Sequence, residues 1–471
     1  MIDTVDVAII GAGTAGLAAL REVRRKTNDF VLINKVPYGT TCARVGCMPS
    51  KTLIAAANAF HARTLLDVFG IQGAGHLKAD IPAVMARVRK LRDHFVEGVL
   101  QSTKDLGERN IAGHARLSGP NRVVVDGHAI KARQIILAPG SSAVVPKAWQ
   151  AFNDRILTTD TLFEERDLPA RIGVIGLGAI GVEMAQALAR LGVQVHGFDG
   201  AEQIAGISDE RIARSLCKSL SKEFTIKLGV NVDLAEADDG VEIEWGDSGV
   251  VVDKVLVAVG RRPNVDNLGL ETLGVALDDK GLPEVDPRTM RIADTSVLFA
   301  GDVNGILPIL HEGADEGHIA GLNAVSEHPV RLDRRTPVTV TFCTPQVASV
   351  GKQARELDLG DCLIGEVDFS KQGRAQIMQE NYGLLRIYAA RDDGRLLGAE
   401  IAAPAAEHMA HLLALAIGQK LGVHQLLGMP YYHPTLEEGL RSALREIARD
   451  LPPCSNSDLA GCGSSKIEAL E

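Results

Sequence analysis

The sequence predicts an α/β protein of about three domains, and three observations lead to this fold class. The chain has 471 residues, whereas a domain usually holds one to two hundred. An apolar strand, a glycine-rich turn, an amphipathic helix and a second apolar strand follow one another twice, at residues 5–33 and 172–198. The C-terminal third contains the helical segment HMAHLLALAIGQKLG, which lies outside both units and has the composition of a core helix.

Composition excludes several classes of protein. Hydrophobic residues make up 46% and charged residues 23%, as in an ordinary globular chain. The net charge of -10, with both signs mixed along the sequence, argues against a nucleic-acid partner. No apolar segment is long enough to span a membrane, and the N-terminus lacks the basic region of a signal peptide. Seven cysteines are too few for a disulfide framework, so we expect a cytoplasmic protein.

The first glycine turn follows the strand at residues 5–10 and reads Gly11-Ala12-Gly13-Thr14-Ala15-Gly16. Gly11 permits the tight turn, Gly13 lets a pyrophosphate approach the backbone, and Gly16 lets the helix pack on the strand. The start of the helix offers free N–H groups to the phosphates. This segment therefore predicts a Rossmann-like dinucleotide-binding unit.

The second copy has its glycines at Gly176, Gly178 and Gly181. In both copies the residue that ends the second strand lies 23 positions after the first glycine, and it is Asn34 in one and Asp199 in the other. The carboxylate of Asp199 can accept hydrogen bonds from ribose hydroxyls and would repel a 2′-phosphate, which favours NAD over NADP. A carboxylate is usual at the position of Asn34, although an amide can still bind the ribose.

Two cysteines lie between these units, in the segment TTCARVGCMPSK. Five residues of ideal helix separate Cys42 from Cys47 by about 7.5 Å, slightly more than a disulfide spans. A bridge therefore needs a local distortion, which Gly46 and Pro49 can provide, and such an irregular disulfide is easily reduced. The alternative is a pair of buried structural thiols. The position next to a nucleotide-binding unit favours the redox interpretation.

These segments together resemble the pyridine nucleotide–disulfide oxidoreductases, over roughly residues 3 to 450. The resemblance implies FAD at the first glycine turn and NAD at the second. Gly140, in QIILAPGS, and Gly260, in VLVAVGRRPN, match the strand ends that close the first flavin segment and the NAD domain. Gly301 and Asp302, in TSVLFAGD, match the second flavin motif, in which the carboxylate faces the ribityl chain.

The resemblance also implies catalytic roles. Cys42 corresponds to the thiol that exchanges with substrate, and Cys47 to the thiol against the flavin. Lys51 and Glu183 match an ion pair near the flavin ring. The segment YHPTLEE places His433 as acid–base and Glu438 as its orienting carboxylate, contributed in the family by the partner subunit of a homodimer.

The implied domain order is an FAD domain in two segments, residues 1–150 and 271–335, an NAD domain at 151–270, an α+β interface domain at 336–450 and a flexible tail at 451–471. The resemblance is greatest to dihydrolipoamide dehydrogenases. It implies oxidation of dihydrolipoyl groups on a carrier protein, with electrons passing through Cys42 and Cys47 to FAD and then NAD. Alternatives are a mercuric-reductase-like or glutathione-reductase-like enzyme, or a redox-sensing flavoprotein with slow turnover. No residue is assigned to a metal.

Several positions depart from the family pattern, namely Asn34, Thr40, Arg44 and Pro139. Arg44 lies between the two cysteines, where it can lower a thiol pKa, bind an acidic substrate or point to solvent. The tail holds Cys454 and Cys462, which are eight residues apart. They either extend the electron relay or are incidental.

Overall fold

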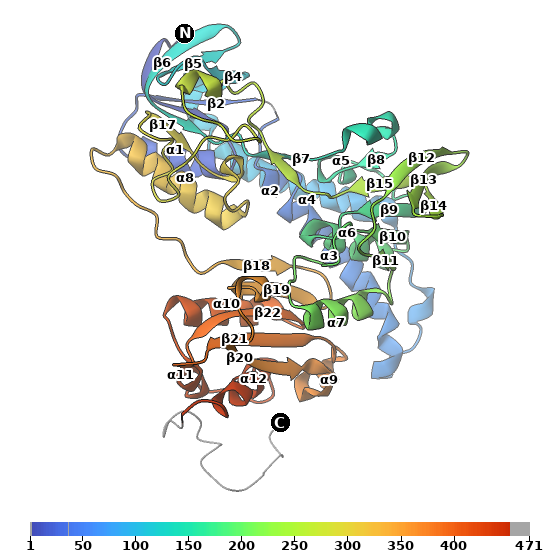
Figure 1. Cartoon of the computed structure of the whole chain (residues 1–471). Helices are drawn as coiled ribbons and strands as arrows, with labels where there is room; N and C mark the ends of the chain where they lie inside the picture. Colours follow the sequence, from blue (N-terminus) through green and yellow to red (C-terminus); the bar gives the residue numbers. More distant parts are fainter. Residues whose placement is uncertain (1, 36, 453–471) are drawn as a thin grey trace.

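The computed structural model describes residues 2–35 and 37–452, so Cys454 and Cys462 lie outside the described residues. Three large sheets organise the chain, as Figure 1 shows. Two contain parallel strands with helices packed on them, and the third, near the C-terminus, is antiparallel. The predicted α/β class, with two Rossmann-like units and a C-terminal α+β domain, is confirmed.

The first sheet has the strand order β3-β2-β1-β6-β5-β4, and β17 pairs with the C-terminal end of β6. Strands β1, β2, β6 and β17 are parallel, and their carboxyl ends are in register at Ile10, Ile33, Leu137 and Phe299. The turns that follow these strands therefore meet at one edge of the sheet. The strands are β1 (Thr4–Ile10), β2 (Phe30–Asn34), β3 (Asn110–Ala112), β4 (Ala115–Leu117), β5 (Arg122–Val125), β6 (His128–Leu137) and β17 (Val297–Phe299).

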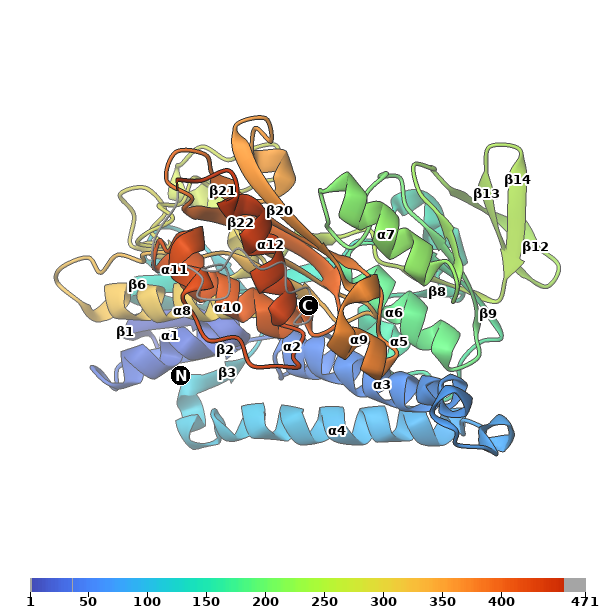
Figure 2. The ribbon, with the colours of Figure 1, turned by 90° about the horizontal axis from the view of Figure 1, so that it is seen from below.

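Two helices, α1 and α8, pack together on one face of this sheet. Their backbones approach closely, because a Cβ on Gly317 of α8 would lie 2.1 Å from the carbonyl oxygen of Ala15. A second group of helices, α2 to α4, projects from the sheet, and Figure 2 shows the long α4 running beside α3 along one side of the molecule. These helices are α1 (Thr14–Arg24), α2 (Thr41–Arg44), α3 (Cys47–His61), α4 (Ile81–Gln101) and α8 (Leu310–Val325).

The second sheet has the order β11-β10-β9-β15-β8, and its strands are parallel. Strands β9, β10 and β15 end in register at Ile175, Phe198 and Val257, which repeats the arrangement of the first sheet. A ribbon of β12, β13 and β14 packs on it, and β7 pairs with β16 between the two units. The elements are β7 (Ser141–Ala143), β8 (Ile156–Leu157), α5 (Thr159–Leu162), β9 (Arg171–Ile175), α6 (Ala179–Arg190), β10 (Gln194–Phe198), α7 (Glu210–Leu220), β11 (Thr225–Lys227), β12 (Asp233–Ala237), β13 (Gly240–Trp245), β14 (Ser248–Val252), β15 (Lys254–Val257) and β16 (Arg261–Pro263).

The third sheet is antiparallel, with the order β18-β19-β22-β21-β20. Helices α10, α11 and α12 share a hydrophobic core with one of its faces, while α7 of the second unit contacts strands β21 and β22. The elements are β18 (Val338–Thr341), β19 (Gln346–Gly351), β20 (Cys362–Asp368), α9 (Gly373–Met378), β21 (Leu384–Ala390), β22 (Leu396–Ala403), α10 (Ala406–Gly418), α11 (Val423–Leu427) and α12 (Glu438–Ala448).

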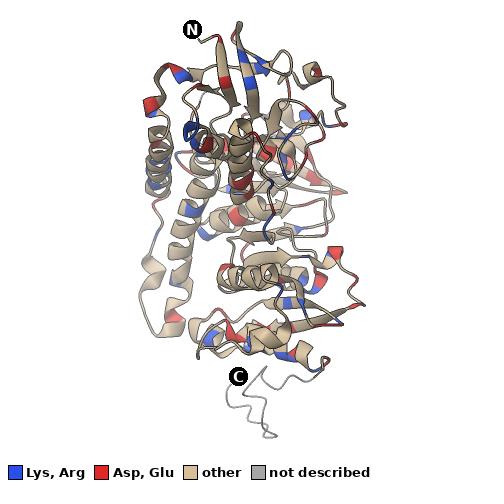
Figure 3. Ribbon diagram, turned by 90° about the vertical axis from the view of Figure 1, so that its left-hand side faces the viewer, with Lys and Arg blue, Asp and Glu red and all other residues tan. Residues whose placement is uncertain are grey.

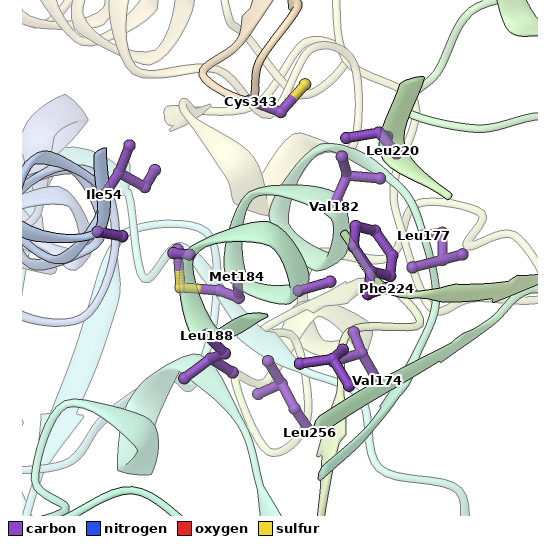
Figure 4. Close-up of a cluster of buried hydrophobic side chains, with 14 of the residues drawn as sticks. Ile54, Val174, Leu177, Val182, Met184, Leu188, Leu220, Phe224, Leu256 and Cys343 are labelled. Carbon is purple, nitrogen blue, oxygen red and sulfur yellow. The ribbon is translucent and has the colours of Figure 1, made fainter. Parts of the chain in front are cut away.

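One hydrophobic cluster joins the three parts. It combines Ile54 of α3, Met184 and Leu188 of α6, and Cys343 of the segment between β18 and β19, and Figure 4 shows these side chains around α6. Burial of apolar surface is the main stabilising term in folding, so this shared core fixes α3 and α6 relative to the third sheet. The helices that carry the candidate site therefore rest on a rigid support.

In the part of the chain from residue 2 to 452, residue 36 apart, no helix is long and apolar enough to cross a membrane. Figure 3 shows acidic and basic residues mixed over the face drawn there, as the sequence indicated.

Candidate active site

The first glycine turn leaves β1 and enters α1. A Cβ on Gly11 would lie 2.1 Å from the carbonyl oxygen of Ala138, and one on Gly16 would lie 1.8 Å from that of Gly11, whereas one on Gly13 would meet nothing within 4 Å. Two glycines thus permit close packing, and the middle one faces open space. Asn34 supports this turn, because its Oδ1 accepts a hydrogen bond from the N–H of Ala12 at 2.8 Å.

The second glycine turn repeats this arrangement between β9 and α6. A Cβ on Gly176 would lie 2.5 Å from the carbonyl oxygen of Ala258, and one on Gly181 would lie 1.7 Å from that of Gly176, while Gly178 again faces open space. Asp199 accepts hydrogen bonds from the N–H groups of Leu177, at 2.6 Å, and Ala201, at 2.8 Å. An ionised carboxylate has about four acceptor sites, so Asp199 keeps capacity for a ribose.

An elongated cavity begins at the first glycine turn. It consists of two adjoining pockets, called here the larger half, of about 490 Å³, and the smaller half, of about 220 Å³. Both are lined by Gly13, Thr41 and Gly140. The larger half reaches Asn34, and the smaller half reaches the two cysteines. The cavity thus extends from the end of β2 to the cysteine pair.

Asp302 and Gly301 follow β17 and line the smaller half. The Oδ2 atom of Asp302 accepts a hydrogen bond from the hydroxyl of Ser141 at 2.7 Å, and Arg261 donates to the same hydroxyl at 2.8 Å. Gly301 has a φ of +84°, in the region that favours glycine. Gly260, with a φ of +120°, lies between β15 and β16 and lines neither half of the cavity.

The two cysteines lie on either side of a break between helices. Helix α2 ends at Arg44 and α3 begins at Cys47, and Gly46 between them has φ -121° and ψ -115°. The expected distortion at Gly46 is therefore present. Pro49 does not contribute to it, because it lies in the first turn of α3, where proline is tolerated.

Both cysteines are free thiols that line the smaller half of the cavity. The thiol of Cys42 donates a hydrogen bond to Cys47, and this bond together with the nearby ammonium of Lys51 outweighs the effect of burial and lowers the pKa of Cys47 to about 6. The same hydrogen bond, together with burial, raises the pKa of Cys42. The reduced pair therefore holds its negative charge on Cys47.

Lys51 is fixed by a carboxylate from another unit of the fold. Its Nζ lies 2.8 and 3.0 Å from the carboxylate oxygens of Glu183, which is on α6 and has a side chain only 5% exposed. Glu183 also accepts the N–H of Phe342 at 2.8 Å, and the Phe342 ring centroid lies 4.8 Å from Nζ. The ion pair and the ring hold the positive charge of Lys51 beside Cys47.

His433 and Glu438 form a separate pair in the third unit. The Nδ1 atom of His433 lies 3.1 and 3.2 Å from the carboxylate oxygens of Glu438, and the N–H of Thr435 donates to the same carboxylate at 3.0 Å. The His433 side chain is 63% exposed, and neither residue lines the cavity beside the cysteines. Within one chain, the structure does not bring this pair to the thiols.

Residues 5–317 match the family model for pyridine nucleotide-disulphide oxidoreductases, and residues 337–444 match the model for the dimerisation domain of the same proteins. The chain belongs to this family.

Curated relatives support the same assignment. The chain is 30% identical to dihydrolipoyl dehydrogenase 3 of Pseudomonas aeruginosa, over 95% of this chain and 98% of the relative. It is 31% identical to the dihydrolipoyl dehydrogenase of Thermus scotoductus, over 94% of this chain and 97% of the relative. The match extends over nearly the whole of both chains, so all three units are shared.

Two solved structures have the same fold. LpdA from Mycobacterium tuberculosis superposes with a TM-score of 0.82 at 24% identity, covering 95% of this chain and all of the other. The Cu(II) complex of the flavoprotein disulfide reductase RclA from Escherichia coli superposes with a TM-score of 0.82 at 22% identity, covering 94% and 99%.

Enzymes of this family use FAD and NAD(P), and the cavity of this member fits FAD. The space above Gly13 can take a pyrophosphate at the start of α1, and Asp302 lies in the half that reaches the cysteines. The space above Gly178 offers the same cradle to the pyridine nucleotide.

Three residues beside the site were not assigned a role from the sequence. Ser141 lies in the segment QIILAPGS and Arg261 in VLVAVGRRPN, so a polar side chain within a quoted motif was the feature that could have identified each of them. Phe342 lies in no motif, and only the tertiary structure brings its N–H to Glu183. Arg44, one of the departures from the family pattern, lines the larger half of the cavity and not the half that contains the thiols.

Proposed function

We propose that this oxidoreductase is a dihydrolipoyl dehydrogenase, which oxidises dihydrolipoyl groups on a carrier protein with NAD as the final acceptor. The observation that carries the proposal is the cysteine pair, which lines the flavin cavity with Cys47 held as a thiolate beside Lys51. The relatives at about 30% identity, named dihydrolipoyl dehydrogenases, support the choice of substrate.

In the proposed reaction a substrate thiolate attacks Cys42 in the oxidised pair. This forms a mixed disulfide and releases Cys47 as a thiolate. The second substrate thiol then closes the substrate disulfide and releases the thiol of Cys42. Two electrons and two protons leave the substrate, and the cysteine pair is reduced. When bound, the flavin supplies two-electron transfer between this pair and the nicotinamide.

His433 is proposed to accept the proton of the substrate thiol. A hydrogen bond from Nδ1–H to Glu438 leaves Nε2 as the acceptor and fixes the orientation of the ring. Because His433 is exposed and lies apart from the cysteines of its own chain, we propose that it serves the site of a partner subunit. The match of residues 337–444 to the dimerisation domain supports this arrangement.

NAD is proposed as the acceptor because Asp199, which directly follows β10, places a carboxylate beside the second glycine turn. A carboxylate there binds ribose hydroxyls and repels a 2′-phosphate. We expect kcat/KM with NAD to exceed that with NADP, and Asp199→Asn to reduce the ratio. An unchanged ratio in this variant would contradict the assignment.

The proposal is tested by the reduction of NAD with dihydrolipoamide and with a reduced lipoyl domain. We expect rapid turnover in the wild type, none in Cys42→Ser, and normal turnover in Cys217→Ser, whose thiol lies on α7 away from the cavity. Cys462→Ser tests the tail in the same assay. A flavin-containing protein that does not oxidise dihydrolipoamide would refute the proposed substrate. Glutathione disulfide, protein disulfides and metal ions would then be tested with NADH or NADPH.

A further inference from the structure

Arg44 has no assigned role in the proposed reaction, and its surroundings point to one. It lies in the last turn of α2, two residues after Cys42, but its side chain lines the half of the cavity that reaches Asn34. The charged groups that act on the thiol of Cys47 are Lys51 and Glu183, which line the smaller half of the cavity. Arg44 therefore faces the larger half of the cavity, which contains the ribose position at Asn34 and is called the adenosine half below.

The guanidinium of Arg44 has no protein partner among the residues that the structure describes. Its Nε atom is buried without a hydrogen bond, although the residue as a whole is only half-buried. A buried donor without a partner costs free energy, so such a group in a cavity indicates a missing acceptor. Arginine carries five N–H donors in a planar fork that suits phosphate oxygens.

The other charges of this half are mostly engaged elsewhere. Arg261 donates to Ser141, and Asp266 accepts from Arg262 at 2.7 Å. Lys35 is exposed, and Asp160 is the remaining acidic residue of the lining. Among the described residues that line this part of the cavity, Arg44 thus provides a half-buried, unpaired positive charge.

Asn34 explains why such a charge is useful in this chain. Its amide is used within the protein, with Oδ1 accepting from Ala12 and Nδ2 donating to the carbonyl of Lys35 at 2.7 Å. It has no carboxylate with which to bind the ribose strongly. The adenosine half therefore lacks the contact between a carboxylate and the ribose, but it contains the guanidinium of Arg44.

We propose that Arg44 anchors the adenosine diphosphate moiety of FAD through its positive charge, in place of the carboxylate that Asn34 lacks. The group recognised is the diphosphate, which is the negatively charged part of the dinucleotide. In this role Arg44 is a cofactor-binding residue that acts independently of the thiols.

The test is the rate at which the holoenzyme releases FAD, followed by the rise in flavin fluorescence on dilution at low and high salt. In the wild type, release should accelerate with salt, because salt screens the contact between Arg44 and the diphosphate. Arg44→Asn should release FAD about tenfold faster at low salt, the order expected for a lost charge-assisted hydrogen bond, with a weaker dependence on salt. Arg214→Asn, on an exposed arginine of α7, is the matched control and should behave like the wild type.

Arg44→Lys keeps the charge without the fork and provides the second test. It should retain the salt dependence of the wild type and release FAD at an intermediate rate. The proposal is overturned if Arg44→Asn releases FAD at the wild-type rate with the wild-type salt dependence, or if Arg44→Lys loses the salt dependence. It is also overturned if Arg44→Asn leaves FAD release unchanged and instead shifts the pH dependence of Cys47 alkylation, because Arg44 would then act on the thiols. Neither measurement depends on the proposed dihydrolipoyl substrate.

Discussion

At the scale of single residues, the difference between the two cysteines arises from three contacts. Cys42 donates a hydrogen bond to Cys47, Lys51 contributes a positive charge, and Glu183 holds Lys51 in place. Both thiols are partly removed from water, and burial alone would raise the pKa of each. The hydrogen bond decides which of them becomes the thiolate, because its donor must keep its proton.

The first prediction compares two substitutions of Cys42. Cys42→Ser keeps an O–H donor, so the pKa of Cys47 should stay near 6, whereas Cys42→Ala removes the donor and should raise that pKa. Since the thiolate is the nucleophile, alkylation of Cys47 should be lost as the pH falls through its pKa, and at a higher pH in Cys42→Ala. The measurement is the pH profile of iodoacetamide labelling, with the site identified by mass spectrometry. Equal profiles for the two variants would contradict the assigned cause.

The second prediction concerns Lys51, whose charge also favours the thiolate. Lys51→Met should raise the pKa of Cys47, because it removes the cation and leaves the Glu183 carboxylate, which itself raises that pKa. Lys254→Met is a suitable control, since it removes a comparable half-buried lysine that is paired with Glu165 away from the cysteines. The same labelling profile measures both variants, and a profile unchanged in Lys51→Met would be evidence against the role of its charge.

At the scale of elements, each glycine turn separates positions that permit packing from a position that contacts the ligand. Gly11 and Gly16 lie against backbone atoms, and Gly13 starts α1 with a φ of -80°, which any residue adopts. Gly11 has a φ of +105°, which L side chains rarely adopt. Within one motif, a side chain at Gly11 or Gly16 would therefore disturb the packing of the protein, whereas a side chain at Gly13 would occupy only the space for the ligand.

The third prediction contrasts Gly11→Ala with Gly13→Ala. The first places a Cβ 2.1 Å from the Ala138 carbonyl oxygen and should destabilise the protein by roughly 3 kcal/mol. The second has space for its Cβ, so we expect a thermal midpoint close to that of the wild type for the apoprotein but a lower flavin content, because the Cβ occupies the space above the turn. Thermal unfolding and the ratio of flavin to protein absorbance separate the two effects. A normal flavin content in Gly13→Ala would contradict the placement of the cofactor.

At the scale of the whole molecule, a buried polar network fixes the second unit on the third sheet. Glu400 of β22 is fully buried and accepts hydrogen bonds from the N–H of Ser208 at 2.6 Å, the hydroxyl of Ser208 at 2.9 Å and the N–H of Ala354 at 2.9 Å. Tyr388 donates to Asp209, which caps α7, and burial together with the two carboxylates raises the pKa of this tyrosine. This contact and the shared core around α6 keep the site helices in place.

The fourth prediction is that Glu400→Ala loosens this docking. The N–H groups of Ser208, Asp209 and Ala354 lose their acceptor, at a cost of about 3 kcal/mol. We expect a lower thermal midpoint and faster proteolysis between the units, while Glu210→Ala, on the exposed face of α7, should behave like the wild type. Equal midpoints for the two variants would show that the network does not stabilise the docking.

The fifth prediction tests whether the active site spans two subunits. Cys42→Ser and His433→Gln should each be inactive, but refolding an equal mixture should restore about a quarter of the wild-type activity, because each mixed dimer keeps one intact site. A mixture of Cys42→Ser with Cys47→Ser is the matched control and should stay inactive, since every site then lacks one cysteine. Failure of the first mixture, with mixed dimers demonstrated, would contradict a shared site.

The sequence by itself determined the local architecture. Glycine spacing and strand patterns are local properties, so the two turns and the break at Gly46 could be predicted from neighbouring residues. The hydrogen bonds from the turns to Asn34 and Asp199 were not predicted, because the sequence pattern assigned both side chains to the ribose. The pairing of Lys51 with Glu183 was expected from the family resemblance and is present.

Only the tertiary structure decided the contacts that join distant segments. The N–H of Phe342 reaches Glu183 across 159 positions, and Glu400 reaches Ser208 across 192, and no local pattern encodes either contact. The direction of the Arg44 side chain was likewise open in the sequence, because a short helix can turn a residue toward either half of a cavity. Its place in the larger half depends on how α2 packs against α3 and α4, an outcome of the tertiary fold that residue spacing alone does not specify.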